Sequence, residues 1–210
     1  MVMHILKLTK EADKLEKWQW VGIMMLTIVF AGFFGWLYEF IFYYFNGGMS
    51  EFYLQGGNFL PWINIYAIGA ILIIFTCWKI RKYPWAVFFV SIFVTGILEL
   101  ISGWLVYTIG DGTRYWDYNV EILNFGNIGG FVCLRSVLAF GVSALFLMYL
   151  VLPFFIWLSQ KVSKRVFLTL AISLFALVMV DEVYNLLASK IFGWPDAAEL
   201  YQKLGWKYHK

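Results

Sequence analysis

The sequence predicts an all-α, polytopic membrane helical bundle of about five transmembrane helices. Of its 210 residues, 62% are hydrophobic and only 14% are charged, so the charged side chains are too few to cover a water-soluble surface. The apolar residues also gather into long runs, and a helix that crosses a bilayer needs roughly 20 such residues. Five segments satisfy this requirement: residues 18–45, 62–78, 85–109, 130–158 and 166–192.

The segments before and after these spans are polar. Residues 1–17 are charged with apolar residues at helical spacing, and they lack the apolar core of a cleavable signal. We therefore expect an interfacial amphipathic helix at residues 1–17 on the cytoplasmic face. Residues 18–192 are expected to form a single transmembrane bundle, and residues 193–210 a polar C-terminal tail.

Basic residues predict the orientation of the spans, because short cytoplasmic loops retain lysine and arginine. They precede the first span and separate the second span from the third and the fourth from the fifth: Lys7, Lys10, Lys14, Lys17, Lys79, Arg81, Lys82, Lys161, Lys164 and Arg165. We expect the N-terminus and these ends of the spans to face the cytoplasm. Arg114 is the only lysine or arginine in loops 46–61 and 110–129, so both loops are predicted to lie outside the cell. The C-terminal tail also falls outside in this topology although it carries three lysines, so its side stays open.

Composition excludes several classes of function. The net charge of +3 comes from the cytoplasmic edges, which suggests contact with anionic lipids and gives no case for nucleic acid. The sequence has no glycine-rich phosphate loop, no Gly-x-Ser-x-Gly and no His-x-x-x-His. Cys77 and Cys133 have no metal-like spacing, and in apolar surroundings they are expected to be packing residues. We therefore expect no metal and no cofactor.

Ionisable side chains interrupt four of the predicted spans: Glu39, Glu99, Arg135, Asp181 and Glu182. A charged side chain at the bilayer centre costs about 2.5 to 3.5 kcal/mol on insertion scales. The carboxylates lie roughly 12 to 17 Å below the outer helix ends, so we expect them to line a shared polar cavity in the bundle interior. Arg135 is expected to neutralise Glu99 or Glu39 with two parallel hydrogen bonds. The structural alternative is a buried ion-pair network that only fixes helix register.

The two outer loops mix glycine, asparagine and proline with aromatic residues, so we expect them to be partly re-entrant. Backbone outside a helix is tolerated at membrane depth where it is buried in protein, and asparagines could satisfy it: Asn58, Asn64, Asn124 and Asn127. The compact cluster of Trp116, Asp117 and Tyr118 is predicted to form a lid or mouth. The alternative is an aromatic belt at the membrane interface.

Five motifs in these regions are similar to a known family: GWLYEF at 35–40, PWINIYAIGA at 61–70, LEL at 98–100, RYWDYN at 114–119 and NIGGFVCLRS at 127–136. With them the chain resembles the CmpB-like, putative ABC-transporter type IV family of small bacterial membrane proteins. The resemblance implies a permease-like protein that would need a separate ATPase subunit, since the chain has no ATPase motif. Two positions differ from the family pattern. Asn64 to Ala67 replace a proline followed by Ile-Tyr-Gly, and Phe131 replaces an arginine, for which Arg135 is a candidate substitute.

Three classes of function remain open. The first is a transporter or permease subunit that binds a small polar or cationic solute in an outward cavity, without being an enzyme. The second is an intramembrane enzyme acting on a lipid, with Glu39 or Glu99 as general base and Arg135 holding a headgroup phosphate. The third is an accessory or structural membrane protein. Expected partners are membrane lipids, the ATPase subunit and a second copy of the chain. The candidate substrate-binding residues are Glu39, Asn64, Tyr66, Glu99, Trp116, Asp117, Tyr118, Asn127, Arg135, Asp181 and Glu182.

Overall fold

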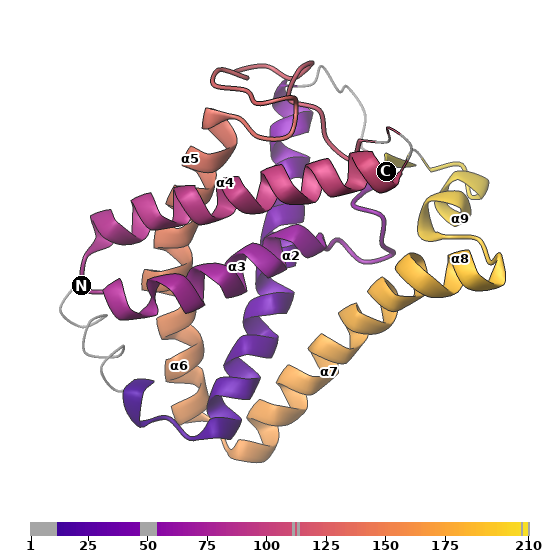
Figure 1. Ribbon diagram of the computed structural model, residues 1–210. Coiled ribbons are helices and arrows are strands. Elements are labelled where there is room, and N and C mark those ends of the chain that lie inside the picture. Colours follow the sequence, from indigo (N-terminus) through magenta and orange to yellow (C-terminus); the bar gives the residue numbers. More distant parts are fainter. Residues whose placement is uncertain (1–11, 47–53, 111, 113, 207, 210) are drawn as a thin grey trace. The chain divides into compact units, whose positions relative to one another are not determined.

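The computed structural model describes residues 12–46, 54–110, 112, 114–206 and 208–209, and these residues are mostly helical (Figure 1). The larger part of the predicted interfacial helix at residues 1–17 lies outside the described residues. A short 3-10 turn, η1 (Ala12–Lys14), precedes the first long helix. Two strands of two residues each, β1 (Leu54–Gln55) and β2 (Tyr208–His209), pair in parallel.

Four helices in the described part are long and apolar enough to cross a membrane. The first two are α2 (Lys17–Asn46) and α4 (Pro84–Ile109). The third is a continuous helix made of α5 (Leu134–Phe146), η3 (Leu147–Val151) and α6 (Leu152–Lys161). The fourth is a continuous helix made of α7 (Lys164–Val183), η4 (Tyr184–Ala188) and α8 (Ser189–Phe192). The second predicted span is a shorter apolar helix, α3 (Asn64–Cys77), which continues into the 3-10 turn η2 (Trp78–Ile80). A further short helix, α9 (Ala197–Lys203), follows α8. The predicted all-α membrane fold is confirmed.

The fourth span begins at Leu134, later than the predicted Gly130, because the preceding backbone is not helical. Gly130 has φ +81°, a left-handed conformation that glycine adopts without steric cost. Cys133 is extended, with φ −140° and ψ 163°, and its amide donates to the Ser136 hydroxyl at 3.4 Å. This side-chain cap fixes the start of α5 at Leu134.

Two of the long helices contain a π-helical segment. In the first, η3 ends two residues before Pro153, which cannot donate to the helical hydrogen-bond ladder. In the second, the Asn185 side chain donates to the carbonyl oxygen of Asp181 at 2.9 Å and so occupies a ladder acceptor. Such π segments are rare and occur frequently at functional sites.

The chain divides into two compact units. The first, the central unit, is Gly69–Phe154, with most of α3, all of α4, loop 110–133, α5 and η3. The second, the terminal unit, consists of the described residues of Glu11–Ile68 and Phe155–Lys210, with α2, the start of α3, most of α6, and α7 to α9. That both units form one transmembrane bundle stays a prediction.

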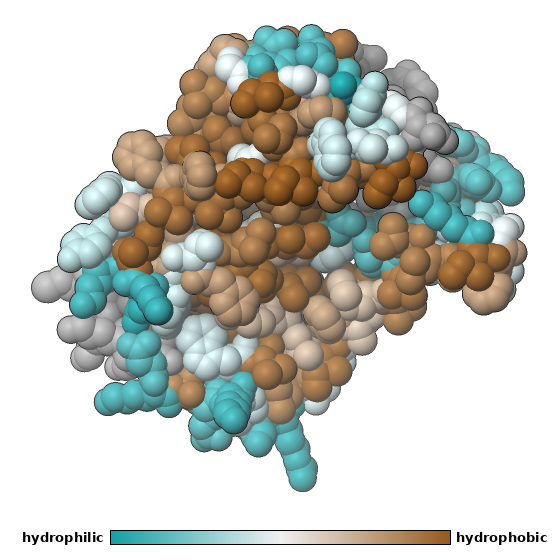
Figure 2. Space-filling view, in the orientation of Figure 1, coloured by the Kyte–Doolittle hydropathy of each residue, from teal (hydrophilic) through white to brown (hydrophobic). Residues whose placement is uncertain are grey.

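Small residues bring α4 close to α5 in the central unit. The buried positions of α4 recur every fourth residue: Val87, Ser91, Thr95, Glu99 and Gly103. On α5, a Cβ added at Gly141 would lie 2.7 Å from the ring of Phe88, so the two helices approach too closely for a larger residue. Another face of α4 is a stripe of apolar side chains that are each at least 41% exposed and suit contact with lipid (brown along α4 in Figure 2): Phe89, Phe93, Ile97 and Ile101.

In the terminal unit, α2 packs against α7. A Cβ added at Gly22 would lie 2.4 Å from the ring of Phe167, and the Lys164 ammonium lies 5.5 Å from the centre of the Trp18 ring. The Gln19 amide donates to the Ser159 hydroxyl at 3.1 Å. The basic ends of α2, α6 and α7 therefore lie together. That they face the cytoplasm stays a prediction.

Candidate functional site

The eleven predicted site residues fall into two groups, one in each unit. The central unit contains Glu99, Trp116, Asp117, Tyr118, Asn127 and Arg135, and the terminal unit contains Glu39, Asn64, Tyr66, Asp181 and Glu182. A cavity shared by all of the carboxylates stays a prediction.

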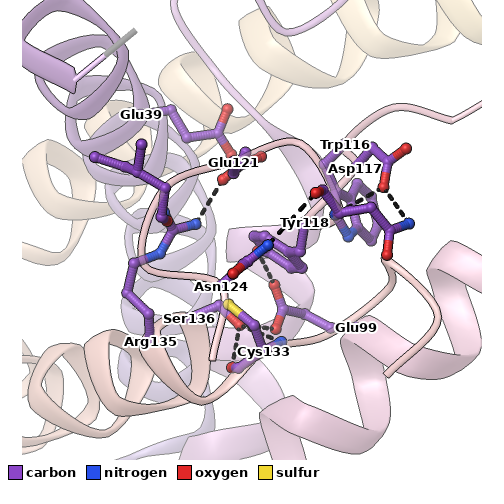
Figure 3. Close-up of polar contacts among 12 residues, drawn as sticks. Glu39, Glu99, Trp116, Asp117, Tyr118, Glu121, Asn124, Cys133, Arg135 and Ser136 are labelled. Atoms are coloured by element: carbon purple, nitrogen blue, oxygen red, sulfur yellow. Dashed lines mark hydrogen bonds and ion pairs between the residues drawn. The ribbon is translucent and has the colours of Figure 1, made fainter. Parts of the chain in front are cut away.

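Glu99 is the centre of the first group (Figure 3). Its side chain lies on the buried face of α4, and the residue is only 4% exposed. The Tyr118 hydroxyl donates to Glu99 Oε1 at 2.6 Å, and the Ser136 hydroxyl lies 2.7 Å from Glu99 Oε2. Burial, and then the neighbouring Glu99, raises the pKa of Tyr118 above its ordinary value, so Tyr118 keeps its proton and acts as a donor.

Arg135 forms an ion pair with Glu121 of the loop. Arg135 Nη2 lies 2.5 Å from Glu121 Oε2, and Arg135 Nη1 donates to the carbonyl oxygen of Ile122 at 2.8 Å. Both charged side chains are largely buried, at 14% and 12% exposure. The expected ion pair between Arg135 and Glu99 is therefore wrong, because the loop folds back over the start of α5 and brings Glu121 to the guanidinium. The alternative pair of Arg135 with Glu39 stays a prediction.

Arg114 contacts aromatic rings and backbone of the same loop region. Its guanidinium lies over the rings of Phe131 and Tyr107, at 4.5 and 4.8 Å from their centres, and it donates to the carbonyl oxygen of Gly129 at 2.9 Å. Phe131 stands where the resembled family usually has arginine. In this chain the ring supplies a stacking surface for a different arginine.

The motif RYWDYN binds the motif NIGG through polar contacts. The Trp116 indole N–H donates to the carbonyl oxygen of Phe131 at 2.9 Å, and the Tyr118 amide donates to that of Gly130 at 3.0 Å. The Asn127 side chain connects Asn119 Oδ1, at 3.0 Å, to the Gly130 amide, at 2.8 Å. These contacts fix the shape of the loop, and Tyr118 is the side chain that the loop contributes to Glu99.

Asp117 also serves the fold of this loop. Its Oδ1 accepts from the backbone amide of Asn119 at 3.0 Å and from the Asn119 side chain at 2.7 Å, and it lies 3.7 Å from the Arg114 guanidinium. An aspartate that bonds the backbone two residues ahead forms an Asx turn. A role of Asp117 in a lid or mouth stays a prediction.

In the terminal unit, Asp181 anchors the first loop to α7. Asp181 Oδ1 accepts from the backbone amide of Phe59 at 3.0 Å, and Oδ2 accepts from that of Leu60 at 2.7 Å. The Asn185 side chain, one turn along the helix, donates to Oδ1 at 2.7 Å. Three N–H donors therefore satisfy this carboxylate.

Glu182 holds the same loop through two asparagines. Asn58 Nδ2 donates to Oε2 at 2.8 Å, and Asn64 Nδ2 donates to Oε1 at 2.7 Å. Asn58 also donates to the carbonyl oxygen of Trp62 at 3.2 Å, so it satisfies loop backbone as expected.

Glu39 accepts a hydrogen bond from the Tyr66 hydroxyl at 2.8 Å. One turn earlier on α2, a Cβ added at Gly35 would lie 2.1 Å from Cγ of Tyr66, and one added at Gly32 would lie 2.1 Å from Nε1 of Trp62. The glycines of α2 therefore make room for the aromatic residues of the motif PWINIY. In each of the two units a membrane-helix glutamate accepts from a tyrosine hydroxyl.

Sequence reasoning did not assign site roles to Ser136, Glu121 and Asn185. Ser136 had no sequence signal of its own, because its capping position depends on the extended backbone of Cys133, which the structure shows. Glu121 could have been found because it is an acidic residue of the outer loop that leads into the fourth span, and Arg135 lies at the outer end of that span. Asn185 follows Asp181 by four residues, on the same face of the helix.

The long apolar helices and their buried carboxylates define a multi-pass membrane protein. The family described as "Putative ABC-transporter type IV" matches residues 26–186. Because this match covers more than half of the chain, the protein belongs to that family, as the motifs predicted. The matched range also includes Asp181 and Glu182, which lie beyond the end of the resemblance predicted from the motifs. No curated protein and no solved structure matches the chain.

Proposed function

We propose that the protein is the membrane-spanning subunit of a transport system driven by a separate ATPase subunit, and that Glu99, Tyr118 and Ser136 form the core of its solute site. The proposed solute is small and polar or cationic. The observation that supports this most is a buried carboxylate in a membrane helix whose described hydrogen bonds come from hydroxyl groups.

The chemistry of this cluster suits a cation. Among the described residues, the salt bridge of Arg135 is formed with Glu121, and Glu99 forms none. The hydroxyls of Tyr118 and Ser136 can rotate away from the carboxylate, and their oxygens can then accept from an ammonium group. The ring of Trp116 adds a face that attracts cations, whereas the Arg135 guanidinium already lies 5.3 Å from the centre of the Tyr118 ring.

The carboxylates of the terminal unit have a different proposed role. Asp181 and Glu182 are occupied by backbone amides and asparagine side chains of the loop, which favours structural anchoring. Glu39 with Tyr66 is the group that corresponds to Glu99 with Tyr118, and we assign it to the solute pathway. In this proposal the N-terminus lies in the cytoplasm and the site opens to the outside, as the distribution of basic residues predicts.

A thermal-unfolding assay of the purified protein in lipid nanodiscs tests the site. The probes are choline, tetramethylammonium and putrescine, with succinate as the anionic control. At least one cation should raise the unfolding temperature, since a ligand at 100 times its Kd stabilises by about 2.7 kcal/mol. Glu99→Gln should abolish this shift, whereas Glu199→Gln, at an exposed position of α9, should retain it. Stabilisation by succinate alone, or an undiminished cation shift in Glu99→Gln, would contradict the proposal.

The energy source is tested separately. Vesicles that contain this protein and an ATPase subunit encoded next to it should take up the stabilising cation only when ATP is supplied. Uptake of the same rate without ATP would exclude this part of the proposal and leave the solute site unaffected.

One contact favours the alternative of an intramembrane lipid enzyme. The Ser136 hydroxyl lies 2.7 Å from Glu99 Oε2, within reach of a general base. In that reading Arg135 holds the headgroup phosphate. Hydrolysis of a phospholipid by the purified protein, lost in both Glu99→Gln and Ser136→Ala, would favour the enzyme over the transporter.

A further inference from the structure

The membrane carboxylates of the two units differ in the kind of donor that they bind. Asp181 and Glu182 accept from N–H groups of loop backbone and asparagine side chains. An N–H group can donate but cannot accept, so each of these contacts has one fixed direction.

Glu99 is bound by hydroxyl groups instead. Tyr118 contacts Oε1 at 2.6 Å and Ser136 contacts Oε2 at 2.7 Å. A serine hydroxyl both donates and accepts. The contact between Ser136 and Glu99 is therefore satisfied in either direction, whether the proton lies on the serine or on the carboxyl group.

The surroundings of Ser136 contain more acceptors than the serine can serve. Ser136 Oγ lies 2.7 Å from Glu99 Oε2 and also 2.8 Å from the carbonyl oxygen of Cys133. The hydroxyl has a single proton, so with an ionised Glu99 one of these two short oxygen pairs has no hydrogen between its atoms. A proton on Glu99 Oε2 resolves the conflict, because Glu99 then donates to Ser136 and Ser136 donates to Cys133.

The charged and titratable groups of the central unit that lie around Glu99 do not remove this conflict. From the loop these are Tyr118, which keeps its proton, and Glu121, which is paired with Arg135. From the start of α5 they are Arg135 and the buried thiol of Cys133. The pair of Glu121 with Arg135 has no net charge, so the cluster around Glu99 offers hydroxyls and a neutral pair.

We propose that Glu99 is a proton-binding site whose state is set by the direction of the Ser136 hydroxyl. On uptake, a proton from water bonds to Glu99 Oε2, and the Ser136 hydroxyl turns to donate to the Cys133 carbonyl. On release, the proton returns to water, and Ser136 turns back to donate to Glu99. The Cys133 carbonyl, at the cap of α5, then loses that hydrogen bond.

This inference deepens the proposed function, because it makes the proton the ion that competes with a cationic solute for Glu99. A solute ammonium and the proton would occupy the same carboxylate in turn. Binding of the cation would then release a proton, and the site would be empty of cation whenever Glu99 is protonated.

Infrared spectroscopy of the full-length protein in lipid bilayers tests the proton site without a solute. The protein should show the C=O stretching band of a protonated carboxyl group at neutral pH, and the band should shift in heavy water. Glu99→Gln should remove the band, whereas Asp181→Asn and Glu182→Gln should keep it. Ser136→Ala should move the band to higher frequency, because the carboxyl proton loses its acceptor.

The outcomes separate the two proposals. A band that persists unchanged in Glu99→Gln, or the absence of the band at every pH down to acid unfolding, would overturn the proton site and leave cation binding standing. If Glu99→Gln does not fold, an unmoved band in Ser136→Ala overturns it. A band that is lost in Glu99→Gln while no cation stabilises the protein supports the proton site and contradicts the proposed solute site.

Discussion

The ring of Tyr66 occupies the space that Gly35 leaves open on α2, since a Cβ at Gly35 would lie 2.1 Å from Tyr66 Cγ. The Tyr66 hydroxyl reaches Glu39, one turn further along the same helix, at 2.8 Å. The two motifs GWLYEF and PWINIY therefore fold as one packed pair. RYWDYN and NIGG form the second such pair, around Gly130.

Gly35→Ala should destabilise the protein because the methyl group has no space. Forcing an extra group into a packed site costs about 1 to 3 kcal/mol, and the hydrogen bond of Tyr66 to Glu39 should weaken as well. Gly69→Ala on α3 is the matched control, since its Cβ would meet Leu98 at an ordinary 3.6 Å. Thermal unfolding in nanodiscs should show a lower midpoint for Gly35→Ala and an equal or higher one for Gly69→Ala. Equal effects of the two changes would contradict the packing described.

Gly130→Ala should disturb the polar contacts of loop 110–133. A Cβ at Gly130 would lie 2.3 Å from Asn119 Nδ2 and 2.5 Å from Asp117 Oδ1, and the residue has φ +81°. Gly57→Ala separates the steric effect of the methyl group from the effect of a left-handed backbone, because Gly57 has φ +79° but nothing within 4 Å of an added Cβ. Hydrogen exchange of the loop amides, Tyr118 included, should accelerate strongly in Gly130→Ala. An unchanged exchange rate of the Tyr118 amide would show that the loop tolerates the methyl group.

Arg135→Leu should destabilise the protein, because it removes the ion pair of a largely buried Glu121. Breaking a buried pair from one side costs about 3 to 5 kcal/mol, whereas neutral replacement of both partners is often tolerated. Arg135→Leu combined with Glu121→Gln should therefore recover stability in chemical unfolding.

The control for this prediction is Arg135→Leu combined with Glu99→Gln, which should not recover. Recovery with Glu99→Gln instead of Glu121→Gln would show that Glu99 is the true partner of the arginine. If the double variant Arg135→Leu with Glu121→Gln regains stability but does not bind the stabilising cation, Arg135 also acts in the solute site.

The predicted orientation places residues 110–129 outside the cell. Val120→Cys, at a position that is 83% exposed, should react with an impermeant thiol reagent applied to intact cells. Lys161→Cys, at the basic end of α6, should react only after permeabilisation. The native Cys77 and Cys133 are buried, so their background labelling should be low. The opposite pattern would invert the topology.

The sequence by itself determined the class of fold, the approximate limits of the apolar helices and the family. These follow from hydropathy and motif order, which are properties of the chain read residue by residue. The positions of Glu99 and Asp181 inside apolar runs also identified them as buried polar groups in need of partners.

The tertiary structure alone decided which partners those groups have. Depth along a helix suggested Arg135 for Glu99, but depth says nothing about the path of a loop. The left-handed Gly130 and the cap at Cys133 return loop 110–133 onto α4 and α5, and this path gives Glu121 to Arg135 and Tyr118 to Glu99. Hydrogen bonds between residues far apart in the sequence depend on that three-dimensional path, which helical periodicity does not encode.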